Sequence, residues 1–312
     1  LPAPERLTAP GNWPAGDTLK DWAMGAAMQR GAQIVAAHVH VGEEAAQDRL
    51  AAFGQTRIDA YAEARDFPAR DGTSGLSENL THGEISVRAC WHVGQRALNE
   101  GRSGAGTFLK ELAWREFAYH LMWHSPHLTT RNWRPEWDAF PWNEDPATPA
   151  FAAWSQGRTG IRFVDAAMRE MYVTGRMHNR SRMIVASYLT KHLMTHWRLG
   201  AAWFADCLVD WDPANNAMGW QWAAGSGPDA SPFFRVFNPV TQLAKFDPED
   251  RYAARWIAEG RQKPHDCALD YFRAIPRHWN LSADDPYPDP IVTPAEGRAR
   301  ALDAYRDRAT PQ

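Results

Sequence analysis

The sequence has few cysteines and no long apolar run, and each shortage excludes a class of protein. Its three cysteines, Cys90, Cys207 and Cys267, lie far apart without a CxxC pair, so they predict neither a disulfide framework nor a metal cluster. No window approaches the roughly 18 consecutive apolar residues of a membrane-spanning helix, so we expect no contact with a membrane. The first five residues lack an initiator Met and a signal-peptide pattern, and we expect a reducing, cytoplasmic compartment.

The composition is that of a folded globular chain with an unusual number of tryptophans. The 312 residues include 34 basic and 37 acidic side chains, a formal net charge of −3, and 44% are apolar. Sixteen residues are Trp, more than core filling explains, which suggests that part of the function depends on indole rings.

The pattern along the chain predicts one all-helical domain over residues 18–312, after a linker rich in Pro, Ala and Gly at 1–17. Helix signals include an N-cap at Ser86, a helix start at Thr107, a stop at Gly175 and a helix over about 177–199 that Gly200 closes. Alternating strand patterns are nearly absent, and there is no GxGxxG motif. Two long stretches, 125–158 and 206–250, are predicted to be irregular and functional.

Two short motifs carry polar groups suited to a ligand. Three hydroxyls and a glycine lie together in Thr73-Ser74-Gly75-Leu76-Ser77, where they can donate to phosphate oxygens or simply cap a helix. In a helix, Glu111, Trp114 and Arg115 share one face, which can bind a nucleic-acid base or form a surface ion pair beside a half-buried indole.

Two longer segments add a basic surface and an aromatic wall. From Met171 to Ala205 the chain has five Arg or Lys residues and no Asp or Glu, which fits a phosphate backbone or a solvated helix face. Asp210 to Trp222 holds two acids, three amides and three indoles, a density that indicates a ligand wall. The spacings His120/His124 and His192/His196 have no third ligand nearby, so we expect no metal.

Residues 61–250 resemble the flavin-binding catalytic domain of the photolyase/cryptochrome family. The ordered strings that carry the resemblance are the 73–77 turn, Glu111-Leu112-Ala113-Trp114-Arg115-Glu116-Phe117, Met177-His178-Asn179-Arg180-Ser181-Arg182-Met183, Gly219-Trp220-Gln221-Trp222 and Phe234-Arg235-Val236-Phe237-Asn238-Pro239. The family's N-terminal α/β antenna domain is missing from this sequence, and three cysteines cannot supply the iron–sulfur cluster of some relatives.

The resemblance implies a bound FAD, folded into a U-shape. The residues that would hold its phosphates and ribityl chain are Tyr61, Thr73, Ser74, Leu76 and Ser77; Gly75 stands where many relatives carry Arg. Asp210 and Asp212 would line the flavin and adenine, with Arg182 paired to Asp210. Asn216 would face flavin N5, where photolyases usually carry Asn, which favours repair over signalling.

The resemblance also implies a substrate pocket and an electron path. The residues that would bind a flipped-out cyclobutane pyrimidine dimer in UV-damaged DNA are Glu111, Trp114, Arg115, Asn179, Arg180, Met183, Trp222 and Gln242. Trp220, Trp197 and Trp142 would form a chain of indoles from the flavin to the surface.

The implied function is a DNA photolyase, a carbon–carbon lyase in which photoexcited reduced FAD splits the dimer. The alternatives are a cryptochrome-like blue-light receptor with the same flavin, or a light-independent nucleic-acid-binding remnant. We expect a monomer, with an antenna domain upstream in a longer chain.

Overall fold

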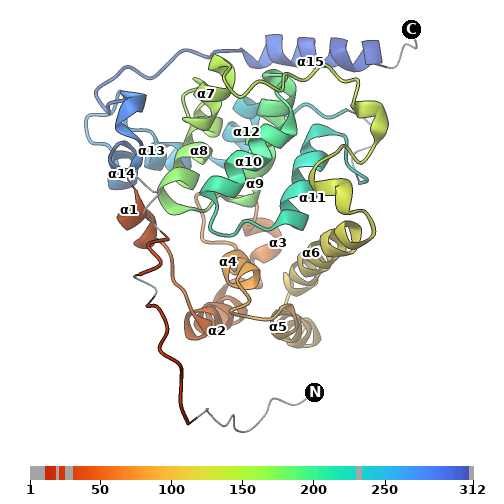
Figure 1. Ribbon diagram of the computed structural model, residues 1–312, viewed down its shortest axis with the longest axis vertical. Helices are drawn as coiled ribbons and strands as arrows, with labels where there is room; N and C mark the ends of the chain where they lie inside the picture. The colour runs from red at the N-terminus through yellow and green to blue at the C-terminus, as the bar shows by residue number, and fades with distance from the viewer. Residues whose placement is uncertain (1–10, 19–20, 25–30, 230–233, 309–312) are drawn as a thin grey trace.

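The protein is an assembly of helices, seen in a computed structural model that describes residues 11–18, 21–24, 31–229 and 234–308 (Figure 1). Within these ranges, the β-type pairing is limited to one bridge between Asn143 and Thr195. The predicted all-α class is therefore confirmed. The predicted linker falls partly outside the described residues, and its remainder, 11–17, forms no helix. None of the described helices is both long enough and apolar enough to cross a membrane.

The α-helices follow one another closely along the chain. Their bounds are α1 (Ala32–Ala36), α2 (Glu43–Ala52), α3 (Tyr61–Ala64), α4 (Ser77–Thr81), α5 (Val87–Asn99), α6 (Ala105–His124), α7 (Pro149–Ser155), α8 (Arg162–Thr174), α9 (Asn179–Ser187), α10 (Trp197–Cys207), α11 (Pro213–Ala224), α12 (Pro239–Phe246), α13 (Arg251–Trp256), α14 (Asp266–Ala274) and α15 (Pro294–Arg308). Two π-helical turns, Phe53–Arg57 and Tyr188–His192, extend α2 and α9, and short 3₁₀ turns lie at Pro126–Thr129, Pro135–Trp137 and Arg277–Trp279.

Two large groups of buried apolar side chains, with a minor third one around Leu121, Leu128 and Ala217, hold the described helices together. The smaller of the two large groups joins α2, α5 and α6 around Phe53, Tyr61 and Phe108. The larger one joins α7 to α11 with α13, α14 and α15, around Trp154 and Trp197, which are both fully buried. Figure 1 shows α2 and α5 at one end of the molecule and α15 along the other. Burial of these large side chains supplies most of the drive for packing.

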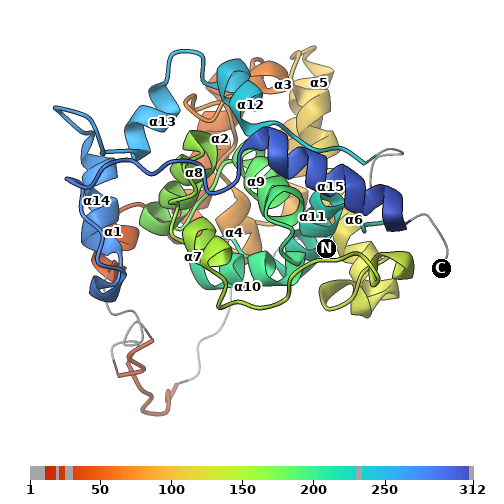
Figure 2. The same cartoon turned by 90° about the horizontal axis from the view of Figure 1, so that it is seen from above.

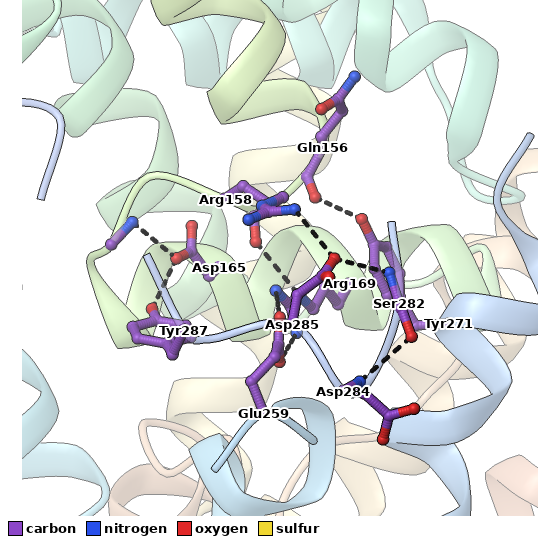
Figure 3. A network of polar contacts seen from close by, with 12 residues as sticks. Gln156, Arg158, Asp165, Arg169, Glu259, Tyr271, Ser282, Asp284, Asp285 and Tyr287 are labelled. Carbon is purple, nitrogen blue, oxygen red and sulfur yellow. Dashed lines mark hydrogen bonds and ion pairs between the residues drawn. The ribbon is translucent and has the colours of Figure 1, made fainter. Parts of the chain in front are cut away.

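A buried polar network ties the segment after α13 to α8 (Figure 3). Both outer nitrogens of Arg169 donate to the Glu259 carboxylate at 2.7 Å, and the two side chains are 0% and 2% exposed. Asp165 accepts from the Thr159 amide and hydroxyl and from the hydroxyl of Tyr287, which lies beyond α14. Burial raises the pKa of Asp165, and these donors oppose the shift.

Two of the predicted helix ends are confirmed. The Ser86 hydroxyl accepts the Ala89 amide at 3.2 Å and begins α5. Gly175, at φ +67°, ends α8 in the left-handed region that favours glycine. The start predicted at Thr107 is wrong, because α6 begins at Ala105 directly after Gly104.

The single helix predicted over about 177–199 is wrong. α9 continues only through the π-helical turn, the chain reverses at Met194 with φ +52°, and α10 begins at Trp197. The ring nitrogen Nδ1 of His196 accepts the Arg198 amide and caps α10, so Gly200 lies inside that helix. Apolar residues recur every four positions on both sides of the break, so the apolar period gives no sign that the helix is interrupted.

The two stretches predicted to be irregular contain three helices, α7, α11 and α12. Each has the same start signal, a polar N-cap followed directly by proline: Thr148-Pro149, Asp212-Pro213 and Asn238-Pro239. Proline at the first helical position loses no hydrogen bond, because that amide has no partner within the helix. The signal was present in the sequence, and the prediction missed it.

Candidate functional site

A cavity of about 610 Å³ opens where the two groups of helices meet, a size typical of ligand-binding pockets. Its walls come from α3, the 73–77 turn, α6, α9 and α11. The predicted site residues that line it are Tyr61, Thr73, Ser74, Leu76, Ser77, Glu111, Trp114, Arg115, Asn179, Arg182, Met183, Asp210, Asp212, Asn216, Trp220 and Trp222. Those that do not line it are Trp142, Arg180, Trp197 and Gln242.

Asp212 organises the wall that α11 provides. Asp212 is the N-cap of α11. Its Oδ1 accepts a hydrogen bond from the Asn215 backbone amide at 2.7 Å and another from the Asn215 side chain at 2.9 Å. Its Oδ2 accepts from the hydroxyl of Tyr119, on α6. Burial, together with this hydrogen bond, raises the pKa of Tyr119 to about 12. Asn216 and Trp220 follow on the same helix and line the same cavity.

Arg182 and Asp210 form an ion pair at the edge of the cavity. Nη2 of Arg182 donates to both carboxylate oxygens, at 2.9 and 2.7 Å, and its Nε donates to the carbonyl of Met177 at 2.8 Å. The Asp210 side chain is 5% exposed and that of Arg182 is 28% exposed, so the carboxylate is shielded from water while the guanidinium keeps some exposed surface. The guanidinium therefore has a set orientation before any ligand binds.

The hydroxyl-rich turn is supported from behind by Arg49, Glu78 and Arg176, which were not predicted to belong to the site. Nη1 of Arg49 donates to the Gly75 carbonyl at 2.8 Å and to the Glu78 carboxylate at 2.7 Å. Arg176 also binds Glu78, with its Nε 2.6 Å from Oε2. Gly75 has φ +65°, and a Cβ there would lie 3.4 Å from Cδ of Arg49, so Arg49 fills the space beside the glycine. No sequence motif links these residues.

The mouth of the cavity has a carboxylate and apolar walls. Glu111 forms an ion pair with Arg65, a residue that was not predicted to belong to the site. Trp114 is 45% exposed and packs edge-on against Phe117, 5.7 Å between ring centroids. Trp222, from α11, is half-buried and also lines the cavity. The arrangement can accept hydrogen bonds from a planar polar group while indole rings cover apolar surface.

Two predicted DNA-contacting residues lie outside this cavity. Arg180 pairs with Asp66 at 2.7 Å, and its guanidinium lies over the Phe246 ring at 4.4 Å. Gln242 lies on α12, and its buried Oε1 has no hydrogen-bond partner among the described residues. Their contact with DNA stays a prediction.

The predicted indole chain is present in part as ring contacts. Trp220 packs directly on α10 at Gly200, where a Cβ would lie 2.1 Å from its ring, one helical turn after Trp197. Trp197 and Trp142 each contact the ring of His196, at 5.5 and 5.1 Å between centroids.

The predicted chain of indoles does not reach the protein surface at Trp142. That indole is 8% exposed, because it stacks on Trp137 at 5.6 Å and 18°, and Trp137 is itself buried. Trp220 also has ring neighbours that the prediction left out, Phe204 at 4.9 Å and Trp154 at 6.0 Å. The electron path therefore stays a prediction.

The four histidines of the two pairs lie in aromatic-ring or capping contacts, and the ring of His192 stacks on Tyr188 at 5.0 Å. The rings of His120 and His124 lie 4.5 Å apart on α6, whereas His196 caps α10. Burial lowers the pKa of His192 to about 4. In the described part of the chain, no group of three His, Cys, Asp or Glu side chains lies close enough to hold a metal ion.

The sequence matches one protein-family model, described as the FAD binding domain of DNA photolyase, over residues 108–307. Among curated relatives, the deoxyribodipyrimidine photo-lyase of Agrobacterium fabrum is 43% identical over 97% of this chain and 64% of its own length. The one from Escherichia coli K12 is 42% identical over 86% of this chain and 57% of its own length.

Solved structures are similar too. A bacterial class III photolyase from Agrobacterium tumefaciens has a TM-score of 0.84 and 42% identity, covering 97% of this chain and 63% of that protein. A cryptochrome from Synechocystis has a TM-score of 0.73 and 31% identity, over 85% of this chain and 56% of that protein. The chain thus spans less than two thirds of the relatives that it matches.

Proposed function

The chain belongs to the family of FAD-binding domains of DNA photolyase, and on this premise we propose that it repairs cyclobutane pyrimidine dimers in DNA with light. FAD is the cofactor of this family. The observation that carries the proposal is one cavity lined by all of the predicted cofactor residues and by most of the predicted dimer-binding residues. The proposed substrate is UV-damaged DNA, the reaction is a carbon–carbon bond cleavage, and the compartment is the cytoplasm.

The residues of the cavity fit a dinucleotide. The hydroxyls of Thr73, Ser74 and Ser77 can donate to phosphate oxygens, and the oriented guanidinium of Arg182 adds a positive charge. A Cβ built on Gly219 meets nothing within 4 Å, so this part of α11 faces open space. The buried ring nitrogens His178 Nε2 and Trp220 Nε1 line the cavity without a hydrogen-bond partner among the described residues. Unpaired buried donors are expected where a polar ligand belongs.

When bound in this cavity, FAD would supply the light-driven one-electron chemistry that opens the dimer. The chain supplies position and environment. Tyr119 and Asn215 hold the Asp212 carboxylate, and Arg182 holds the Asp210 carboxylate, so these acids keep one orientation as the cavity fills. Asn216 offers an amide that neither gains nor loses a proton near neutral pH.

At the mouth, the proposed roles of the side chains follow from their chemistry. Trp114 and Trp222 provide apolar walls for a pair of fused bases, and the Glu111 carboxylate accepts hydrogen bonds from base edges. A dimer stacks and pairs poorly in duplex DNA, so its extrusion costs less free energy than that of normal bases. The defect itself therefore contributes selectivity.

The test is blue-light repair of an oligonucleotide that carries one thymine dimer, with the FAD-loaded protein under reducing conditions. We expect loss of the dimer, followed by absorbance, in the light and none in the dark. A flavin-loaded protein that binds the oligonucleotide but leaves the dimer intact in the light contradicts the proposal.

The second candidate is a blue-light receptor without repair activity, which the similarity to the Synechocystis cryptochrome favours. It predicts the same bound FAD but no preference for damaged over undamaged oligonucleotide. Comparing the two dissociation constants therefore separates the candidates. The remaining proposals are a monomer, an antenna domain in a longer chain and a domain that extends over residues 18–312.

A further inference from the structure

A second cavity, of about 590 Å³, shares no lining residue with the first. Its walls come from the end of α8, from α13 and from the segment between α13 and α14. Figures 1 and 2 both place α13 and α14 at the opposite side of the molecule from α6, which forms the mouth of the first cavity. We refer to this second space as the basic cavity.

The lining of the basic cavity is strongly positive. Its cationic residues are Arg176, Arg251, Arg255, Arg261 and Lys263, whereas Glu170 is its one carboxylate. Three of these cations form ion pairs. Arg176 pairs with Glu78. Arg251 pairs with Glu249, and Arg261 pairs with Asp250. The chain as a whole carries a net charge of −3, so this excess of cations is local.

Two of these cations, Arg255 and Lys263, form no ion pair with a described carboxylate. Arg255 lies over the ring of Trp256 at 5.5 Å and forms no ion pair within the described ranges. Lys263, seven residues after Trp256, likewise forms none among the residues that the structure describes. They come from α13 and from the following segment, and both line the cavity.

The one carboxylate is engaged in the wall. Glu170 accepts the hydroxyl of Tyr252 at 2.5 Å, and that tyrosine accepts from Ser181 of α9 at 3.1 Å. Burial raises the pKa of Glu170 to about 7, so near neutral pH it carries only part of a negative charge. Five cationic side chains therefore outnumber one carboxylate that is only partly ionised near neutral pH.

We propose that the basic cavity is a second anion-binding site and that its ligand carries two or more phosphate groups. Arginine forks match phosphate oxygens, and several cations gathered around one cavity favour a ligand with several negative charges. The volume exceeds what a single inorganic ion fills and lies in the range of nucleotide-sized ligands.

Two kinds of ligand carry several phosphate groups. One is a free polyphosphate such as a nucleoside triphosphate, and the other is the backbone of a DNA strand that continues past the first cavity. The second kind of ligand rests on the proposed function, whereas the first does not. Neither readout below involves a dimer or light, so a failure of repair and a failure of this site remain distinguishable.

The test compares the FAD-loaded protein with the double variant Arg255→Gln/Lys263→Gln. The matched control is Arg88→Gln/Arg298→Gln, which removes two exposed cations from α5 and α15, away from both cavities. One assay measures binding of sodium tripolyphosphate by calorimetry. The other measures how the affinity for an undamaged single-stranded 16-mer falls with salt concentration.

If a free polyphosphate is the ligand, the cavity variant loses tripolyphosphate affinity at least tenfold, and the control and wild type stay alike. If the DNA backbone is the ligand, the negative slope of log K against log salt becomes shallower by about 1.4 in the cavity variant. This is the contribution of two single-strand phosphates. If the cavity variant behaves like the control in both assays, the proposal is wrong. A wild type that binds neither probe overturns it as well.

Discussion

Trp114 offers the sharpest test of the proposed substrate pocket. Its indole lines the first cavity, is 45% exposed and packs against one other aromatic ring among the described residues, that of Phe117. The ring therefore has free surface for a base to cover, and little of the protein core depends on it. Replacement by alanine removes the apolar wall without opening a buried void.

The size of the expected effect follows from the contact that would be lost. Stacking of one base on an aromatic side chain contributes about 1–3 kcal/mol. Since about 1.4 kcal/mol corresponds to a tenfold change in affinity, Trp114→Ala should weaken binding of a dimer-containing oligonucleotide by about 5- to 150-fold. Binding of undamaged duplex depends mainly on phosphate contacts and should change little.

The measurement is a pair of titrations, with damaged and undamaged oligonucleotides of the same sequence. Trp123→Ala is the matched control, because Trp123 lies on the same helix, is 83% exposed and does not line the cavity. Flavin absorbance of the purified variants checks that FAD is retained. If Trp114→Ala keeps the wild-type preference for damage, or Trp123→Ala loses it equally, the assignment of this wall is wrong.

Three further changes test other parts of the molecule. Arg169→Met leaves the Glu259 carboxylate buried and unpaired, so the free energy of unfolding in urea should fall by about 3–5 kcal/mol, and Arg169→Met/Glu259→Leu should recover most of it. Tyr119→Phe removes the donor to Asp212 and should lower the free energy of unfolding by about 1.5–3 kcal/mol; an unchanged value would show that the hydrogen bond is not formed. Trp220→Phe should slow the light-driven loss of oxidised-flavin absorbance yet spare repair by chemically reduced protein, and an unchanged rate would place the electron path elsewhere.

The candidate site combines residues of two kinds. Its lining was predictable, because the strings around Glu111, Asn179 and Trp220 are contiguous and resemble one family in order. The side chains that support the lining could not be predicted from the sequence. Arg49 and Arg176 both bind Glu78, yet they lie 29 and 98 residues away from it along the chain. Only packing brings them together.

Helix boundaries show the same division at shorter range. The caps at Ser86 and Gly175 depend on neighbouring residues, and the sequence was sufficient to find them. The break between α9 and α10 depends on a bridge from Asn143 to Thr195 and on a left-handed residue at Met194. Neither feature interrupts the apolar repeat of the segment, so periodicity alone predicted one long helix.

By itself, the sequence determined the all-helical class, the family and most of the cavity lining, because helix propensity, caps and motif strings are local properties of the chain. The tertiary structure alone decided that Tyr119 binds Asp212, that Trp142 is covered by Trp137, and that Arg255 and Lys263 gather at a second cavity. These are contacts between separate elements. They depend on how the helices pack, and the shape and charge of a cavity follow from that packing.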